Sequence, residues 1–173
     1  MTICATRILS IITITLTLVG CSGSAPMNVE AVDLGLSVKW ASMNVGATEE
    51  AEFGDYFAWG ETSSKSTYSW NSYAYESTEC GKPNDDMAKL TDIASTSYDA
   101  ASVNWGGGWH MPNYAQISEL VNKCTWTWTT LKTSKGKVVH GYIIISNVDG
   151  YTDKSIFLPA VGYRIDNGVD LVE

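Results

Sequence analysis

Apolar and polar residues alternate strictly between Val32 and Trp40, where every even position is apolar. A period of two predicts a half-buried strand over this stretch, or two short strands that turn near Gly35. The aromatic residues between Phe53 and Trp59 predict a further strand, which Gly60 ends.

The middle of the chain carries the signals of two helices. Residues 98–105 can form a short helix ahead of the glycine run at 106–108. A clearer helix follows Pro112, because Asn113 is a favourable N-cap and Gln116 completes a capping box. Apolar residues then recur at the spacing i, i+3, i+4 and i+7, which predicts a core-facing stripe made of Ile117, Leu120, Val121 and Cys124.

The chain after Cys124 is patterned as strands. Thr and Trp alternate over residues 125–129, which places Trp126 and Trp128 on one face. Lys135-Gly136-Lys137 predicts a turn after these residues. The nearly unbroken apolar and β-branched run at 138–145 predicts a central strand, and residues 156–158 predict another. Strands, a long loop, a helix and then further strands are typical of the α+β class.

The N-terminus carries an export signal. An apolar run from Ile8 to Val19 follows the positive charge of Arg7 and ends in Leu18-Val19-Gly20-Cys21. As a helix this run would span roughly 18 Å, too little for a hydrocarbon core of about 30 Å. The setting of Cys21 resembles the lipobox of bacterial lipoproteins, which implies that residues 1–20 are removed and Cys21 is lipidated. An ordinary cleaved signal and a retained anchor are the alternatives.

These boundaries predict a simple organisation. Residues 21–31 form a tether, and residues 32–173 form one domain. The hairpin signal at 166–168 is followed by only five residues, which barely begin a returning strand. We therefore expect this domain to be incomplete at its C-terminus.

Charge and cysteine content narrow the classes of partner. The formal net charge is −8, and residues 1–20 hold one basic and no acidic residue, so the mature chain would carry −9. Binding to nucleic acid or to anionic lipid relies on clustered Lys and Arg, so we expect neither. Cys80 and Cys124 form a disulfide of an exported protein, or Cys124 is a buried thiol; the sequence leaves both open.

Patterns that carry catalysis or bind metals are sparse. No Gly-x-Ser-x-Gly element occurs, and we expect no enzymatic activity. His110 and His140 are not brought together by their spacing, so we expect no metal and no cofactor. Arg164, the only arginine after the leader, is expected to pair with a carboxylate. The oxygen-bearing residues Asn147, Asp149 and Asp153 are better explained by a turn than by a calcium-binding loop.

Aromatic residues are the main candidate ligand contacts. The chain has seven Trp and nine Tyr, most of which we expect in the core. Residues 61–86 form a long, polar, irregular segment, where aromatic side chains have less reason to be buried. We therefore assign ligand binding first to the four aromatic residues of this loop, Tyr68, Trp70, Tyr73 and Tyr75. The strand pair Trp126 and Trp128 is the second choice, because core packing explains it.

Five ordered motifs stand out together, Val32–Ala41, Asn44–Ala47, Gly54–Glu61, Trp105–Pro112 and Phe157–Arg164. They resemble the Fibrobacter succinogenes major paralogous domain, a family common in surface lipoproteins of gut bacteria. The resemblance implies a C-type-lectin-like fold. His110 and Asn113 stand where the family usually has Arg and Thr. Family members also continue past the last motif into closing strands, and a chain without them should be less stable or prone to aggregate.

Anchor, charge and resemblance together lead to one functional expectation. We expect a lipid-anchored, non-catalytic binding module on the outer membrane or cell surface that recognises a glycan or another surface component. Its membrane contact would be the lipid on Cys21. The alternative is a structural or adhesive subunit of a surface assembly, which contacts protein rather than sugar.

Overall fold

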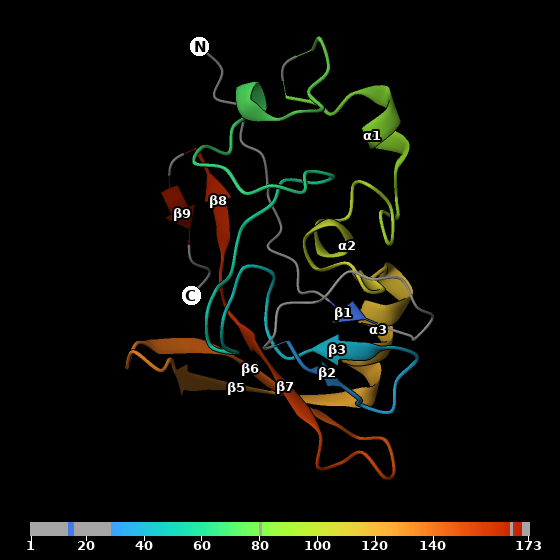
Figure 1. Ribbon diagram of the computed structural model, residues 1–173, viewed down its shortest axis with the longest axis vertical. Coiled ribbons are helices and arrows are strands. Elements are labelled where there is room, and N and C mark those ends of the chain that lie inside the picture. The colour runs from blue at the N-terminus through green and yellow to red at the C-terminus, as the bar shows by residue number, and fades with distance from the viewer. Residues whose placement is uncertain (1–13, 16–28, 80, 167, 171–173) are drawn as a thin grey trace.

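Antiparallel sheets with few helices make this an α+β protein (Figure 1). The computed structural model describes residues 14–15, 29–79, 81–166 and 168–170, so Cys21 and Cys80 lie outside the described residues. Within that part the strands form a four-stranded, a three-stranded and a two-stranded sheet. The longest helix and the two larger sheets lie toward one end of the molecule, and helix α1 (Asp85–Lys89) lies at the other (Figure 1).

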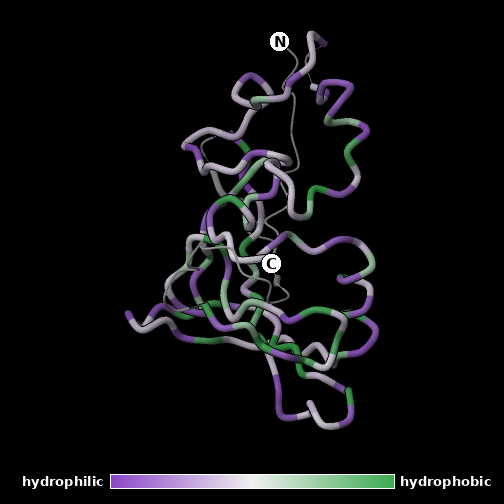
Figure 2. Tube along the Cα trace, turned by 45° about the vertical axis from the view of Figure 1, so that its right-hand side comes forward, coloured by the Kyte–Doolittle hydropathy of each residue, from purple (hydrophilic) through white to green (hydrophobic). Residues whose placement is uncertain are grey.

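The three-stranded sheet is the most regular element. It consists of β5 (Cys124–Lys132), β6 (Val138–Ser146) and β7 (Ser155–Pro159), with β6 in the centre. β5 and β6 pair without a break from Cys124–Ser146 to Lys132–Val138. The predicted central strand and the predicted turn at 135–137 are both confirmed. The turn forms a hydrophilic tip on the hairpin (Figure 2).

Helix α3 (Tyr114–Lys123) covers one end of this sheet and builds the main core. Its predicted cap is confirmed, because the Asn113 side chain accepts from Gln116 N and the Gln116 side chain accepts from Asn113 N. Leu120 is fully buried with Trp40 and Ile144. The predicted stripe was too wide: Val121 is 53% exposed, and Cys124 is already part of β5 rather than of the helix.

The four-stranded sheet has the order β2-β3-β1-β4, in which all neighbours are antiparallel. Its strands are short: β1 (Ile14–Thr15), β2 (Ala31–Val32), β3 (Lys39–Ala41) and β4 (Trp109–His110). The alternating stretch 32–40 therefore forms two strands rather than one. Gly35 turns between them with φ +70°, and a Cβ there would meet the ring of Tyr151.

The structure differs from the sequence expectation at two places, the end of the tether and the segment 53–59. The Glu30 carbonyl accepts from Ser42 N, the Glu30 N–H donates to the Ser42 hydroxyl, and Ala31 belongs to β2, so the end of the expected tether is part of the sheet. The strand expected at 53–59 was wrong, because this segment has no strand pairing. Its aromatic residues are instead held by packing, Phe53 against a core around Tyr56 and Phe57 against a core around Trp105.

The remaining elements are short. Helix α1 (Asp85–Lys89) begins at the Asn84 cap, helix α2 (Ala100–Trp105) confirms the helix expected at 98–105, and η1 (Trp70–Ser72) is a single turn. Most of the segment 61–86 is irregular, as predicted. The predicted hairpin forms from β8 (Tyr163–Ile165) and β9 (Gly168–Asp170).

A buried carboxylate joins the middle of the fold. Asp99 is completely buried, caps α2 through the backbone N–H groups of Ala101 and Ser102, and also accepts from the Ser102 hydroxyl. It further accepts from Ser95 N at 2.8 Å and from Met111 N at 2.9 Å, just after β4. One side chain thus fixes a loop, a helix start and the end of a strand.

Removing this carboxylate should destabilise the domain strongly. Asp99→Ala leaves the buried N–H of Ala101 and the partly buried N–H groups of Ser95 and Met111 without a partner, so we expect the free energy of unfolding to fall by about 3 kcal/mol. Urea denaturation measures this. The control is Asp149→Ala at an exposed turn, which should change the value by less than about 0.5 kcal/mol. Equal midpoints for the two variants would contradict the role given to Asp99.

Candidate functional site

The aromatic residues of the loop, the first choice from the sequence, pack mainly against one another. Trp70, Tyr73 and Tyr75 are partly buried and continue to Tyr98 in an edge-to-face series. Successive ring centroids lie 5.6–5.8 Å apart. This geometry is the one that aromatic rings prefer when they stabilise each other. The series therefore gives a polar, irregular segment a small core of its own.

Tyr68 is a core residue, which corrects its assignment to a ligand site. Its side chain is 1% exposed, so it offers no surface to a ligand. Its hydroxyl donates to the carbonyl of Tyr56 and accepts from Lys65 N. Its backbone pairs with Asp166 in both directions, at 2.8 and 2.9 Å, and so ties the loop to the β8–β9 hairpin.

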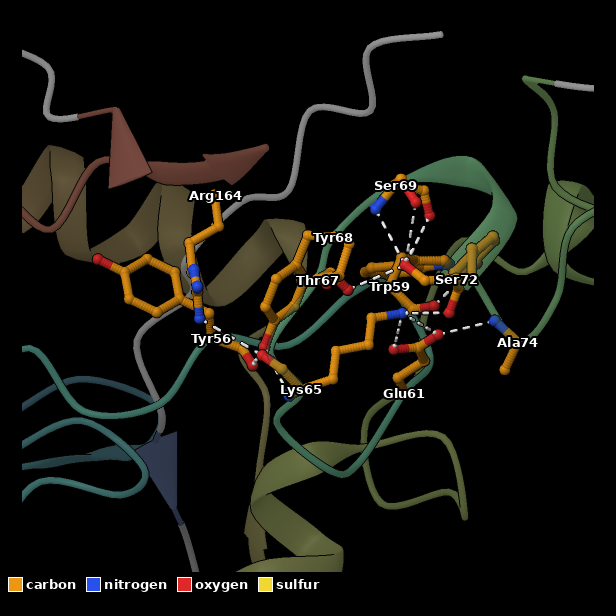
Figure 3. A network of polar contacts seen from close by, with 11 residues as sticks. Tyr56, Trp59, Glu61, Lys65, Thr67, Tyr68, Ser69, Ser72, Ala74 and Arg164 are labelled. Atoms are coloured by element: carbon orange, nitrogen blue, oxygen red, sulfur yellow. Dashed lines mark hydrogen bonds and ion pairs between the residues drawn. The ribbon is translucent and has the colours of Figure 1, made fainter. Parts of the chain in front are cut away.

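Arg164 has no carboxylate partner within the described ranges, although the sequence predicts one. Among the described residues its guanidinium donates to the carbonyls of Lys65 and Ser66, at 3.4 and 3.2 Å. It lies between the rings of Tyr56 and Tyr68, 5.8 and 5.0 Å from their centroids (Figure 3). The cation is therefore held by ring faces and carbonyl oxygens, which are weaker partners than a carboxylate.

The ion pair of this region joins Lys65 to Glu61 at 2.7 Å, and both side chains are largely buried. Lys65 Nζ also donates to the carbonyl of Ser72, and Glu61 accepts from Ala74 N (Figure 3). The Lys65–Glu61 pair thus connects its own part of the loop to the backbone at Ser72 and at Ala74. Burial and then the charge of Glu61 raise the pKa of Tyr73 to about 12.

A second group of aromatic residues is exposed. Trp128 is 48% exposed and Tyr142 is 39% exposed, and they are direct cross-strand partners on β5 and β6. Their centroids lie 4.9 Å apart, and the His140 ring stacks on Trp128 at 6.1 Å with an interplanar angle of 18°. We call Trp128, His140 and Tyr142 the aromatic platform.

The position of the aromatic platform follows from strand geometry. Even-numbered residues of β5 and β6 share one face of the sheet, because side chains alternate along a strand and pair across it. At the inner end of this face, Ile144 lies in the main core and Trp126 packs against that core. The Trp126 indole N–H donates to the carbonyl of Leu120 in α3 at 3.4 Å. Farther along the same face the residues are exposed. The aromatic platform is therefore the part of this face that lies outside the core and is open to solvent.

Two hollows open elsewhere on the surface. One hollow, of about 410 Å³, lies between the 46–54 loop and the β5–β6 turn. There Lys137 Nζ lies over the Phe53 ring, 4.3 Å from its centroid. The other, of about 190 Å³, is lined by Trp59, Tyr114 and Asp92. Neither hollow contains a residue of the aromatic platform.

The described residues give no metal centre. No group of three or more His, Cys, Asp or Glu side chains in the described ranges is placed to hold an ion. His110 is engaged with the Met111 carbonyl through Nδ1, and His140 belongs to the aromatic platform. Cys124 is a free, buried thiol whose pKa is raised by burial. In the part of the chain that is described, no helix is both long and apolar enough to cross a membrane.

Comparison with protein-family models, curated proteins and solved structures found no match. The fold itself thus defines the class as an α+β domain with antiparallel sheets. The sequence had placed Trp126 and Trp128 second among the candidate contacts, and the exposed member of that pair is Trp128. Tyr142 and His140 were missed, although the cross-strand pairing of 124–132 with 138–146 brings them together.

The raised pKa of Tyr73 predicts an alkaline loss of stability. The group favours its neutral form in the folded state, so its contribution is complete below pH 10 and is lost as the pH rises toward about 12. Tyr73→Phe cannot ionise and should flatten this part of the stability curve. Thermal denaturation between these pH values, with tyrosinate absorbance recorded in parallel, checks this. An unchanged slope in the variant would exclude Tyr73 as the source.

Proposed function

We propose that this protein is a lipid-anchored, non-catalytic surface module that binds a glycan through the aromatic platform. The observation that supports it best is the pair of exposed rings, Trp128 and Tyr142, on a long and fully paired hairpin. Exposed aromatic groups on a regular scaffold commonly mark an interaction site. They offer large contact area at small cost in side-chain entropy, because a Trp or Tyr side chain has two torsions.

A sugar ring suits this surface for two reasons. Its C–H face is apolar and flat enough to lie on an aromatic ring, while its hydroxyls need polar neighbours. His140 and Thr130 are direct cross-strand partners beside the rings, are exposed, and can donate or accept hydrogen bonds. The acidic chain would disfavour an anionic ligand, so a neutral glycan is the better candidate.

The proposed fold family is C-type-lectin-like, as the resemblance to the Fibrobacter succinogenes major paralogous domain implies. The α+β class and the antiparallel sheets support this proposal. So does the motif Trp109-His110-Met111-Pro112, which leads from β4 into the capped start of α3.

We infer that residues 1–20 are removed and that Cys21 carries the lipid, which would hold the domain at the outer membrane or cell surface. The support is the sequence of the N-terminus, and Cys21 itself lies outside the described residues. Several acyl chains on one residue would anchor the protein stably, whereas a single chain holds only marginally.

Replacing the acceptor cysteine tests the anchor. Cells that express Cys21→Ala should incorporate no labelled palmitate into this protein, and its precursor should keep residues 1–20. Fluorography and intact mass measure the two effects. The control is Cys124→Ala, whose label should be unchanged because that thiol is buried. Palmitate on the Cys21→Ala protein would refute lipidation at this position.

Replacing the central ring tests the ligand site. The glycan-array signal of detergent-solubilised protein with Trp128→Ala should fall by a factor of about ten or more, because central aromatic contacts dominate such interfaces. The matched control is Trp59→Ala. Trp59 is 39% exposed and lies far from the hairpin in the sequence. We expect the control to bind like the parent protein. An equal loss in both variants, or none in either, would contradict the aromatic platform as the site.

The second candidate function is a structural or adhesive subunit of a surface assembly. One observation favours it: β1 (Ile14–Thr15), a strand within the four-stranded sheet, belongs to the segment predicted to be removed. The mature chain would then carry strands whose neighbour is missing. Such strands pair readily with an extended segment of another chain.

A further inference from the structure

The four-stranded sheet contains one strand from the N-terminal leader. β1 lies between β3 and β4 and pairs with both, Ile14 with Trp40 and with His110, and Thr15 with Lys39 and with Trp109. Because β1 is antiparallel to each neighbour, β3 and β4 run parallel to one another. Two strand spacings separate them, about 9.5 Å in all, so their backbones cannot bond directly across the gap.

Removal of residues 1–20 would open this gap. β3 pairs with β2 on its other side, so the side of β3 that faces β4 has no other strand partner among the described residues. Both flanking strands carry buried tryptophans, Trp40 and Trp109, so their backbones lie close to the interior. Backbone groups in such a place are costly to leave unpaired. We call this gap the β3–β4 slot.

We propose that the β3–β4 slot accepts, in the mature protein, an extended segment supplied by a partner polypeptide of the same surface assembly. The inference rests on the second proposed function and on the removal of residues 1–20. Recognition is by backbone pairing on two sides at once, which is stronger than addition to a single open edge because the segment gains two ladders.

The occupant's chemistry can be inferred from the strand that fills the slot in this structure. It runs antiparallel to both neighbours and spans at least the two residue pairs formed by Ile14 and Thr15. The surrounding stretch, residues 11–15, reads Ile-Ile-Thr-Ile-Thr, which is rich in the β-branched residues that strands favour. A partner segment should therefore be short, β-branched and uncharged, and should lack proline at the paired positions.

A synthetic peptide of residues 11–17 is the probe for the slot. It is added to mature protein that has been exported, solubilised in detergent and shown by intact mass to lack residues 1–20. Hydrogen exchange at residues 37–43 and 107–111, which span β3 and β4, should slow at least tenfold with the peptide. The hairpin β5–β6 should not respond. The control peptide carries Ile14→Pro, which cannot form the ladder and should protect neither segment.

The unexported full chain supplies a second measurement, because it keeps β1 in place. There the two segments should be protected without any peptide, and Ile14→Pro should remove that protection while the β5–β6 hairpin stays protected. This separates an open slot from a domain that has failed to fold.

Three results would overturn the proposal. The first is a lack of protection by the parent peptide. The second is full protection in the mature monomer before peptide is added, which would show that its own chain fills the slot. The third is retention of residues 1–20 in the exported protein. Trp128→Ala should leave the peptide response intact, so a failure of the glycan site and a failure of the slot are distinguished.

Discussion

The unbroken ladder between β5 and β6 is the constraint on which most of this molecule depends. Nine consecutive residues of β5 pair with β6, so one face carries core residues at one end and exposed rings at the other. Ile144 and Trp128 are thus set by the same register, although one is buried and the other faces solvent. A slip of one residue would exchange the two faces and remove the core and the aromatic platform together.

Features fixed by neighbours in the sequence could be predicted. The cap at Asn113, the turn at 135–137 and the central strand predicted at 138–145 depend on local patterns, and all three were found. The strand expected at 53–59 failed because a strand needs a partner, and an aromatic pattern alone does not supply one. The four-stranded sheet could not be foreseen either, because its short strands come from distant parts of the chain.

The candidate site shows the same division. The sequence placed Trp126 and Trp128 on one face correctly, but their exposure depends on how much of that face α3 covers. Arg164 has partners almost a hundred residues away, which no local pattern contains. Tyr68 was assigned to a ligand because its segment is polar, yet its hydrogen bonds to Tyr56 and Asp166 make it the centre of a small core.

The buried thiol of Cys124 links folding to chemical integrity. It lies where α3 passes into β5, and its raised pKa keeps it protonated. Outside the cytoplasm, oxidants are plentiful and a thiol remains reduced only while it is shielded. Each opening of the junction between helix and hairpin would expose a thiol that such an oxidant can join to a second thiol as a disulfide between two chains. In an oxidising compartment, the lifetime of the closed junction therefore sets how long this thiol stays reduced.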